Sequence, residues 1–197
     1  MRVPVLTLFF VLVGRLAAPS EATAQYHHLT DAIVVGGTLA AAGSGSETLA
    51  GGPEIGGLIE IPVGDEFRLR GEAAAGFWHF NGYPYDQIAG SALRRHRLTL
   101  SVLRSRDVLG PSRRLAGYGG GGAGLYFYRY ASRPDSGAWG IHGIVGAEYL
   151  LPTIRSRWIA AGELQLHAMG GPRGPTGLAG LPMLSAHVAA AIKYRLP

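Results

Sequence analysis

The residues best suited to chemistry lie late in the chain, on segments where apolar and polar residues alternate. Imidazoles can ligate a metal or act as general bases, and a serine beside a histidine is a nucleophile–base pair in principle. With neighbouring carboxylates, these groups could form a metal site or an acid–base site. The candidates on the polar faces are His142, His167, His187, Glu148, Glu163 and Ser185.

A second candidate is the glycine run from Gly117 to Gly124, which is interrupted by Tyr118 and Ala123. A loop that cradles a phosphate needs a helix N-terminus directly after its glycines. Here the aromatic sequence LYFYRY follows instead. We therefore predict a strand whose small residues permit curvature or leave room for large side chains opposite.

Binding chemistry is predicted in the segment 81–91, where Tyr83, Tyr85 and Asp86 form a possible contact surface. Tyrosine offers a large contact area at a small entropic cost. No recognition motif identifies a partner for this loop. The chain has no cysteine, which excludes disulfides and thiolate metal sites, and no cofactor is predicted.

The elements that position these side chains are predicted from one repeated pattern. From Gln25 onward, stretches of about 10–15 residues alternate apolar with polar or very small residues, and each ends in a turn. This is the period of a strand with one apolar and one polar face. We count eight such segments: 31–42, 54–63, 66–80, 93–106, 114–130, 138–151, 158–168 and 184–196.

The polar faces of these segments carry charges of both signs, whereas residues such as Leu98, Leu100 and Val102 share the opposite face. An eight-stranded barrel has an interior just wide enough to be filled by side chains. Charges inside it must pair, because leaving one unpaired costs several kcal/mol. The predicted lumen network is Glu60, Arg68, Arg70, Glu72, Arg95, Arg97, Glu148, Glu163, His167, His187, Lys193 and Arg195.

The connections between segments differ in length and composition. Residues 62–65, 107–112 and 152–155 are short, whereas 43–53, 81–92, 131–137 and 169–182 are longer or richer in Gly, Pro, Ser and Asp. Alternation of short and long connections is typical of an antiparallel up-and-down barrel with short periplasmic turns and longer extracellular loops.

Residues 1–24 have the organisation of a secretory signal peptide. Arg2 supplies a positive start, Val3 to Val13 form an apolar stretch, and Ala22-Thr23-Ala24 is a small-residue cleavage site. We predict one mature domain, 25–197. Although the net charge is +5, the arginines are scattered over the segments, so an exported chain of this kind is not expected to bind nucleic acid.

Aromatic residues lie near the ends of the apolar faces, as in the interfacial girdles of membrane barrels. A closed barrel also satisfies every backbone polar group internally, as a bilayer requires. Export and this pattern together predict an all-β transmembrane barrel in the outer membrane. The aromatic residues are Phe67, Phe77, Trp139, Tyr149, Trp158 and Tyr194.

The stretches GGLIEIPVGDEFRLRGEAAAGFWHF, LAGYGGGGAGLYFY and GIHGIVGAEYLL resemble the small outer-membrane β-barrels related to the outer-membrane protein A and X barrels. The resemblance covers residues 30–197 and rests on pattern. It implies outer-membrane lipid and the barrel-assembly machinery as partners. It also implies a Gram-negative, porin-like membrane protein without a cofactor.

We therefore expect a structural or surface-interaction role with a filled lumen and no enzymatic activity. One alternative is a narrow channel for small solutes, which needs loose packing around Gly120, Gly122 and Gly124. Another is an outer-membrane lipid hydrolase using Ser185, His187 and Glu163, although its groups would have to reach the lipid-facing surface. The last is a soluble, lipocalin-like exported barrel, which requires the apolar faces to point inward.

Overall fold

The computed structural model describes residues 33–44, 51–79, 92–107, 114–129, 136–152, 157–170 and 182–196. The predicted signal peptide and the predicted loop contacts Tyr83, Tyr85 and Asp86 lie outside these residues. The strands are β1 (Val34–Ser44), β2 (Gly52–Val63), β3 (Phe67–His79), β4 (Ala92–Asp107), β5 (Leu115–Arg129), β6 (Ser136–Leu150), β7 (Trp158–Gly170) and β8 (Pro182–Arg195).

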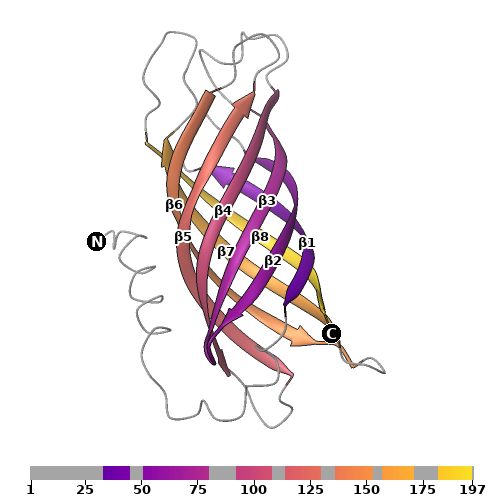
Figure 1. Ribbon diagram of the computed structural model, residues 1–197. Helices are drawn as coiled ribbons and strands as arrows, with labels where there is room; N and C mark the ends of the chain where they lie inside the picture. The colour runs from indigo at the N-terminus through magenta and orange to yellow at the C-terminus, as the bar shows by residue number, and fades with distance from the viewer. Residues whose placement is uncertain are drawn as a thin grey trace, which may run out of the picture.

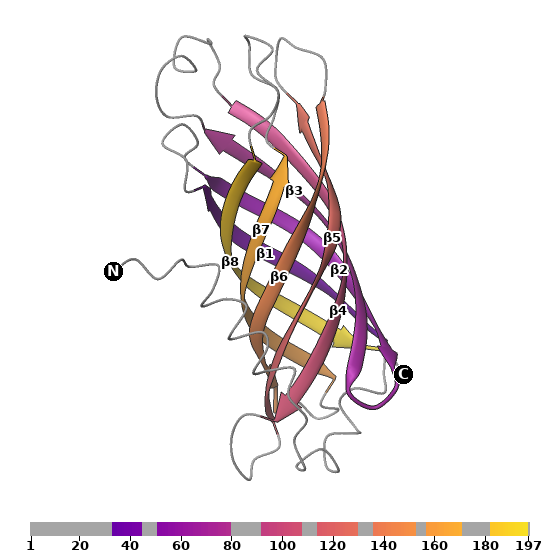
Figure 2. The same cartoon turned by 90° about the vertical axis from the view of Figure 1, so that its left-hand side faces the viewer.

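The strands form one closed barrel in which each strand pairs with its neighbours in the sequence (Figure 1). All pairings are antiparallel, and β1 pairs with β8 to close the ring (Figure 2). Closure leaves no edge strand and bonds the strand backbones to one another. Within the described residues, no helix is long and apolar enough to cross a membrane. The predicted eight-stranded up-and-down barrel is confirmed.

The faces of the strands are those predicted from the alternation. On β4, Leu98, Leu100 and Val102 are 52%, 56% and 53% exposed, whereas Arg95 and Arg97 are 1% and 2% exposed. Charged side chains therefore point into the barrel and apolar side chains point out. The soluble, lipocalin-like alternative is wrong, because it needs the opposite orientation.

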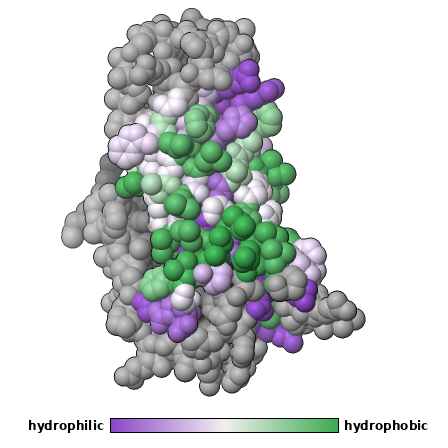
Figure 3. Space-filling model, viewed as in Figure 1, coloured by the Kyte–Doolittle hydropathy of each residue, from purple (hydrophilic) through white to green (hydrophobic). Residues whose placement is uncertain are grey.

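The outer wall is largely apolar. Figure 3 shows hydrophobic residues across the barrel wall, with hydrophilic residues gathered toward its ends. Aromatic residues are part of this surface, with Trp139 75% exposed and Phe77 53% exposed. Water would hydrate so large an apolar surface poorly, whereas the hydrocarbon core of a bilayer matches it. The barrel is therefore built to span a membrane.

The turn between β2 and β3 spans only three residues, 64–66, and Gly64 makes it possible. Gly64 has a φ of 70°, in the left-handed region that favours glycine. The longest gaps between strands, 80–91 and 171–181, both follow odd-numbered strands and therefore lie at the same end of the barrel. We call this the loop end; the opposite end, where β1 begins and β8 ends, is the terminal end. The connection after β5 is shorter than predicted, because β6 already begins at Ser136.

The glycine run lies inside β5, as predicted, and is followed by the rest of that strand and not by a helix. A Cβ atom on Gly120 or Gly122 would overlap the carbonyl oxygens of Val102 and Leu100 on β4. These glycines therefore let the two backbones approach closely. The phosphate-cradle interpretation does not fit this geometry.

Candidate functional site

The lumen contains two clusters of ion pairs, one toward each end of the barrel. The proximal cluster, toward the terminal end, consists of Glu60, Arg68, Arg70, Glu148, Glu163 and Lys193. The distal cluster, toward the loop end, consists of Glu54, Glu72, Arg95 and Arg97. Three carboxylates meet three cations in the first cluster, and two meet two in the second. Each cluster is thus balanced in charge by itself.

Arg70 is the centre of the proximal cluster. Its Nη2 donates to Glu60 Oε1 at 2.6 Å and to Glu163 Oε1 at 2.8 Å. Lys193 Nζ donates to Glu60 Oε1 at 2.9 Å and lies 3.4 Å from Glu148 Oε2. Several charge-assisted hydrogen bonds offset the cost of removing these ions from water. The cluster connects β2, β3, β6, β7 and β8 across the interior.

Tyr118 of β5 completes this cluster. Its hydroxyl donates to Glu163 Oε1 at 2.5 Å. The Arg70 guanidinium carbon lies 5.5 Å from the centre of its ring, and Lys193 Nζ lies 4.8 Å from it, both within cation–π range. Gly146 leaves the room for this ring, because a Cβ atom there would lie 2.6 Å from Tyr118 Cζ. The aromatic ring therefore fills the lumen beside the ion pairs.

Glu54 is the centre of the distal cluster. It accepts hydrogen bonds from the Arg95 guanidinium, from Arg97 Nε at 3.2 Å and from Trp78 Nε1 at 3.0 Å. Arg95 also stacks over the Trp78 ring, 4.0 Å from its centre. Arg97 Nη2 donates to Glu72 Oε1 at 2.5 Å. This arrangement links β2, β3 and β4 inside the lumen.

Gln165 joins the two clusters. Its Nε2 donates to Glu163 Oε2 at 2.9 Å and to Glu72 Oε2 at 3.5 Å. Its Oε1 lies 3.2 Å from His167 Nε2. A single amide side chain therefore connects the proximal cluster, the distal cluster and the histidines of the lumen.

Three histidines lie side by side on neighbouring strands, with the His142 and His167 rings stacked and the His187 ring tilted against His167. The ring centres of His142 and His167 are 5.2 Å apart, and those of His167 and His187 are 4.3 Å apart. Ser101 Oγ lies 2.7 Å from His142 Nε2, and Tyr126 Oη lies 2.6 Å from His167 Nδ1. Among the described residues, no three His, Cys, Asp or Glu side chains are arranged to hold a metal ion.

Ser185 and His187 lie together, but Glu163 is not with them. Ser185 Oγ is 3.1 Å from His187 Nε2, and the carboxylate near His187 Nδ1 is Glu54, at 3.3 Å. Arg95 Nη2 lies 3.0 Å from the same Nε2 atom. Because a guanidinium only donates, it competes with the serine for the lone pair that a general base needs. Ser185 and His187 are 1% and 0% exposed, whereas Leu184 and Val188 on the same strand are 43% and 67% exposed, so the serine and the histidine are on the inner face of β8.

Of the predicted lumen residues, all but Arg195 are buried inside the barrel. Arg195 ends β8 at the terminal end and is half-buried. Sequence reasoning placed Gln165 on the same polar face as Glu163 and His167, but it missed Glu54, Trp78, Tyr118 and Tyr126 as lumen partners. The alternation along the strands could have identified two of them. Glu54 is six positions from Glu60 and Trp78 is six positions from Glu72, and residues an even number of positions apart on a strand share a face.

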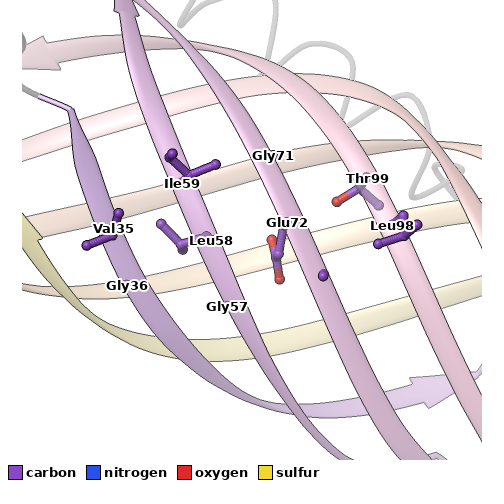
Figure 4. A pocket seen from close by; sticks show the side chains of 10 residues that line it. Val35, Gly36, Gly57, Leu58, Ile59, Gly71, Glu72, Leu98 and Thr99 are labelled. Carbon is purple, nitrogen blue, oxygen red and sulfur yellow. The ribbon is translucent and has the colours of Figure 1, made fainter.

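The outer wall has a shallow hollow of about 550 Å³ over β1 to β4 (Figure 4). Val35, Ile59 and Leu98 are among its lining residues, with Gly57 and Gly71 between them. Glu72 also belongs to the lining, but its carboxylate binds Arg97 in the lumen. The hollow offers an apolar surface and no described group arranged for catalysis.

Comparison with known proteins supports the fold. No family model matches the chain, and no curated protein matches it. The structure is similar to Neisserial surface protein A, with 12% identity, a TM-score of 0.58, and coverage of 83% of this chain and 96% of that one. It is also similar to the outer membrane protein OprG from Pseudomonas aeruginosa, with 14% identity, a TM-score of 0.51, and coverage of 83% and 94%. The chain therefore has the fold of small outer-membrane barrels.

Proposed function

We propose that the chain is an integral outer-membrane barrel with a closed lumen that serves a structural or surface-interaction role, without catalysis and without a cofactor. The observation that carries this proposal is the pair of charge-balanced clusters inside an apolar outer wall. Arg70, for example, is held between Glu60 and Glu163, which come from opposite parts of the chain. Surrounding lipid and the barrel-assembly machinery are its proposed partners, and nucleic acid is not.

A solute channel is less well supported by the geometry. The channel alternative requires open space beside Gly120, Gly122 and Gly124, but Cβ atoms at these positions would meet the backbone of β4. The side chains that cross the lumen are also held by several partners each, as Glu60 is by Arg68, Arg70 and Lys193. A solute would have to break these ion pairs to pass.

An enzymatic role also has little support, since the groups that could act are turned inward. Ser185 and His187 share their environment with the Arg95 guanidinium. A surface-interaction role would instead depend on the connections at the loop end. The predicted contact residues there, Tyr83, Tyr85 and Asp86, remain candidates for binding a partner.

Conductance across a planar lipid bilayer tests the closed lumen. We expect the reconstituted protein to give no stable single-channel steps. The matched variant removes side chains from both clusters while keeping each balanced in charge. It combines Arg70→Ala, Tyr118→Ala and Glu163→Gln in the proximal cluster with Arg97→Ala and Glu72→Gln in the distal cluster. This variant should conduct, because it empties the middle of the lumen. Steady channel openings by the unmodified barrel would contradict the proposal.

A further inference from the structure

Strand β4 has an arginine at each border of its apolar outer face. Arg94 and Arg104 are on the same face of β4, because they are an even number of positions apart. The exposed residues Leu98, Leu100 and Val102 lie between them on that face. Ten residues of strand span about 34 Å. At a strand tilt of about 40°, this is about 26 Å along the barrel axis, close to the roughly 25 Å apolar band of membrane barrels. The spacing of the two arginines therefore matches the distance between the two headgroup layers.

At the terminal end, the charge of Arg104 is neutralised within the barrel. Its Nη2 lies 2.6 Å from Glu66 Oε2, and its Nε donates to the same oxygen at 2.8 Å. Its guanidinium also lies over the Phe67 ring, 5.8 Å from the centre. This arginine thus has both an acidic partner and an aromatic one.

At the loop end, Arg94 has the aromatic partner but not the acidic one. Its guanidinium lies 5.6 Å from the centre of the Phe77 ring, and none of the described carboxylates forms an ion pair with it. In register, Arg94 lies between Phe77 on β3 and Arg129 on β5. Arg129 and the next outward residue, His96, are both exposed. We call Arg94, His96 and Arg129 the cationic edge.

Two cations directly opposite each other on paired strands repel, because their Cα atoms are only about 4.5–5.5 Å apart. An anion that contacts both removes this cost, and guanidinium groups bind phosphate through paired hydrogen bonds. Arg129 also has interactions within the chain, so Arg94 is the group to test first. The chemistry that fits the cationic edge is therefore a phosphate group.

The position of the edge specifies what carries this phosphate. One step further into the apolar face, Leu98 and Leu125 are paired and 52% exposed each, and Phe127 is 42% exposed beside His96. A ligand that contacts both regions has an anionic head and apolar chains. We propose that the cationic edge binds the phosphate of an anionic lipid headgroup, with its acyl chains lying against Leu98 and Leu125. This proposal rests on the membrane insertion proposed above.

The test measures lipid retained by the purified barrel from mixed micelles of phosphatidylglycerol and phosphatidylcholine, by native mass spectrometry. We expect the unmodified barrel to prefer phosphatidylglycerol. Arg94→Gln should lower this preference about fivefold, as expected for one basic residue near an anionic surface, and Arg94→Gln with Arg129→Gln should lower it further. Arg104→Gln is the matched control and should retain the preference, because Arg104 already has Glu66.

Equal retention by the double variant and the unmodified barrel would overturn the proposal, as would a lack of preference in the unmodified barrel. If the Gln variants do not fold, Arg94→Lys with Arg129→Lys keeps the charge but loses the planar fork, and should bind phosphatidylglycerol with reduced preference. Displacement of the lipid by an equal concentration of inorganic phosphate would indicate a free-anion site and contradict the lipid assignment.

The same samples separate this inference from the proposed function. Each is loaded unheated on a denaturing gel, where a folded membrane barrel migrates differently from the heated chain. A mobility shift without a lipid preference contradicts only the cationic edge as a lipid site. Absence of the shift in the unmodified protein contradicts membrane insertion, and the lipid site with it.

Discussion

At the scale of single residues, the lumen shows how a chain can bury many charges without leaving them unpaired. Glu60 is 0% exposed and binds Arg68, Arg70 and Lys193 at 2.7, 2.6 and 2.9 Å. A carboxylate can accept several hydrogen bonds at once, which suits it to a position among three cations. The cost of burying the group is offset only while all of these partners remain charged and in place.

Removing the charge of Glu60 should therefore weaken the barrel strongly. We expect Glu60→Gln to lower the free energy of unfolding by about 3–5 kcal/mol, because it leaves the buried proximal cluster with three cations and only two carboxylates. The measurement is equilibrium unfolding in urea, with the protein in lipid vesicles. Glu66→Gln is the control. It removes the charge of Glu66, whose ion pair with Arg104 is partly exposed to solvent, and it should lower the free energy of unfolding by less than about 1 kcal/mol. Equal losses for both variants would show that the network does not stabilise the fold.

At the scale of elements, strand β5 fits its neighbours because it lacks side chains where they approach. Gly122 faces Leu100 O on β4, Gly124 faces Thr99 of the same strand, and Gly146 on β6 makes room for Tyr118. Close backbone approach is one of the recognised reasons for glycine inside a strand. Glycine has a low strand propensity, but at these positions the absence of a side chain allows close strand approach and leaves space for large lumen side chains.

The substitution Gly122→Ala tests this account of β5. Its Cβ atom would overlap Leu100 O, so the β4–β5 pairing must shift and assembly should fail or the stability should fall. The control is Gly162→Ala on β7, where a Cβ atom meets nothing within 4 Å. The yield of the folded form on an unheated gel measures both variants. Normal assembly of Gly122→Ala would contradict the close approach of the strands.

The sequence alone predicted the strands and their faces, because alternation with a period of two directly reflects which side chains point inward. It did not predict which charges pair. Arg70 and Glu163 are 93 positions apart, and their contact depends on barrel closure and on the register of distant strands. The grouping of Ser185 and His187 with Glu163 failed for the same reason, since the carboxylate beside His187 is Glu54 on β2, which the β1–β8 pairing brings two strands from β8.

At the scale of the whole molecule, the chain is inverted relative to a soluble barrel, with its charges inside and its apolar residues outside. The outer wall has large exposed side chains on every strand of the ring, from Leu39 on β1 to Ile192 on β8. In the lumen, the ion pair between Arg70 and Glu163 connects β3 and β7 on opposite sides of the barrel. This combination is stable in a bilayer and unfavourable in water, so location and fold are linked.

The most direct test of this account is fractionation of cells that express the chain, with unheated and heated samples of each fraction compared on a denaturing gel. The account predicts that the protein is found in the outer-membrane fraction, and that its unheated form migrates differently from the heated chain because the closed barrel resists the detergent. Release as a soluble periplasmic protein, with no difference between unheated and heated samples, would contradict the membrane barrel.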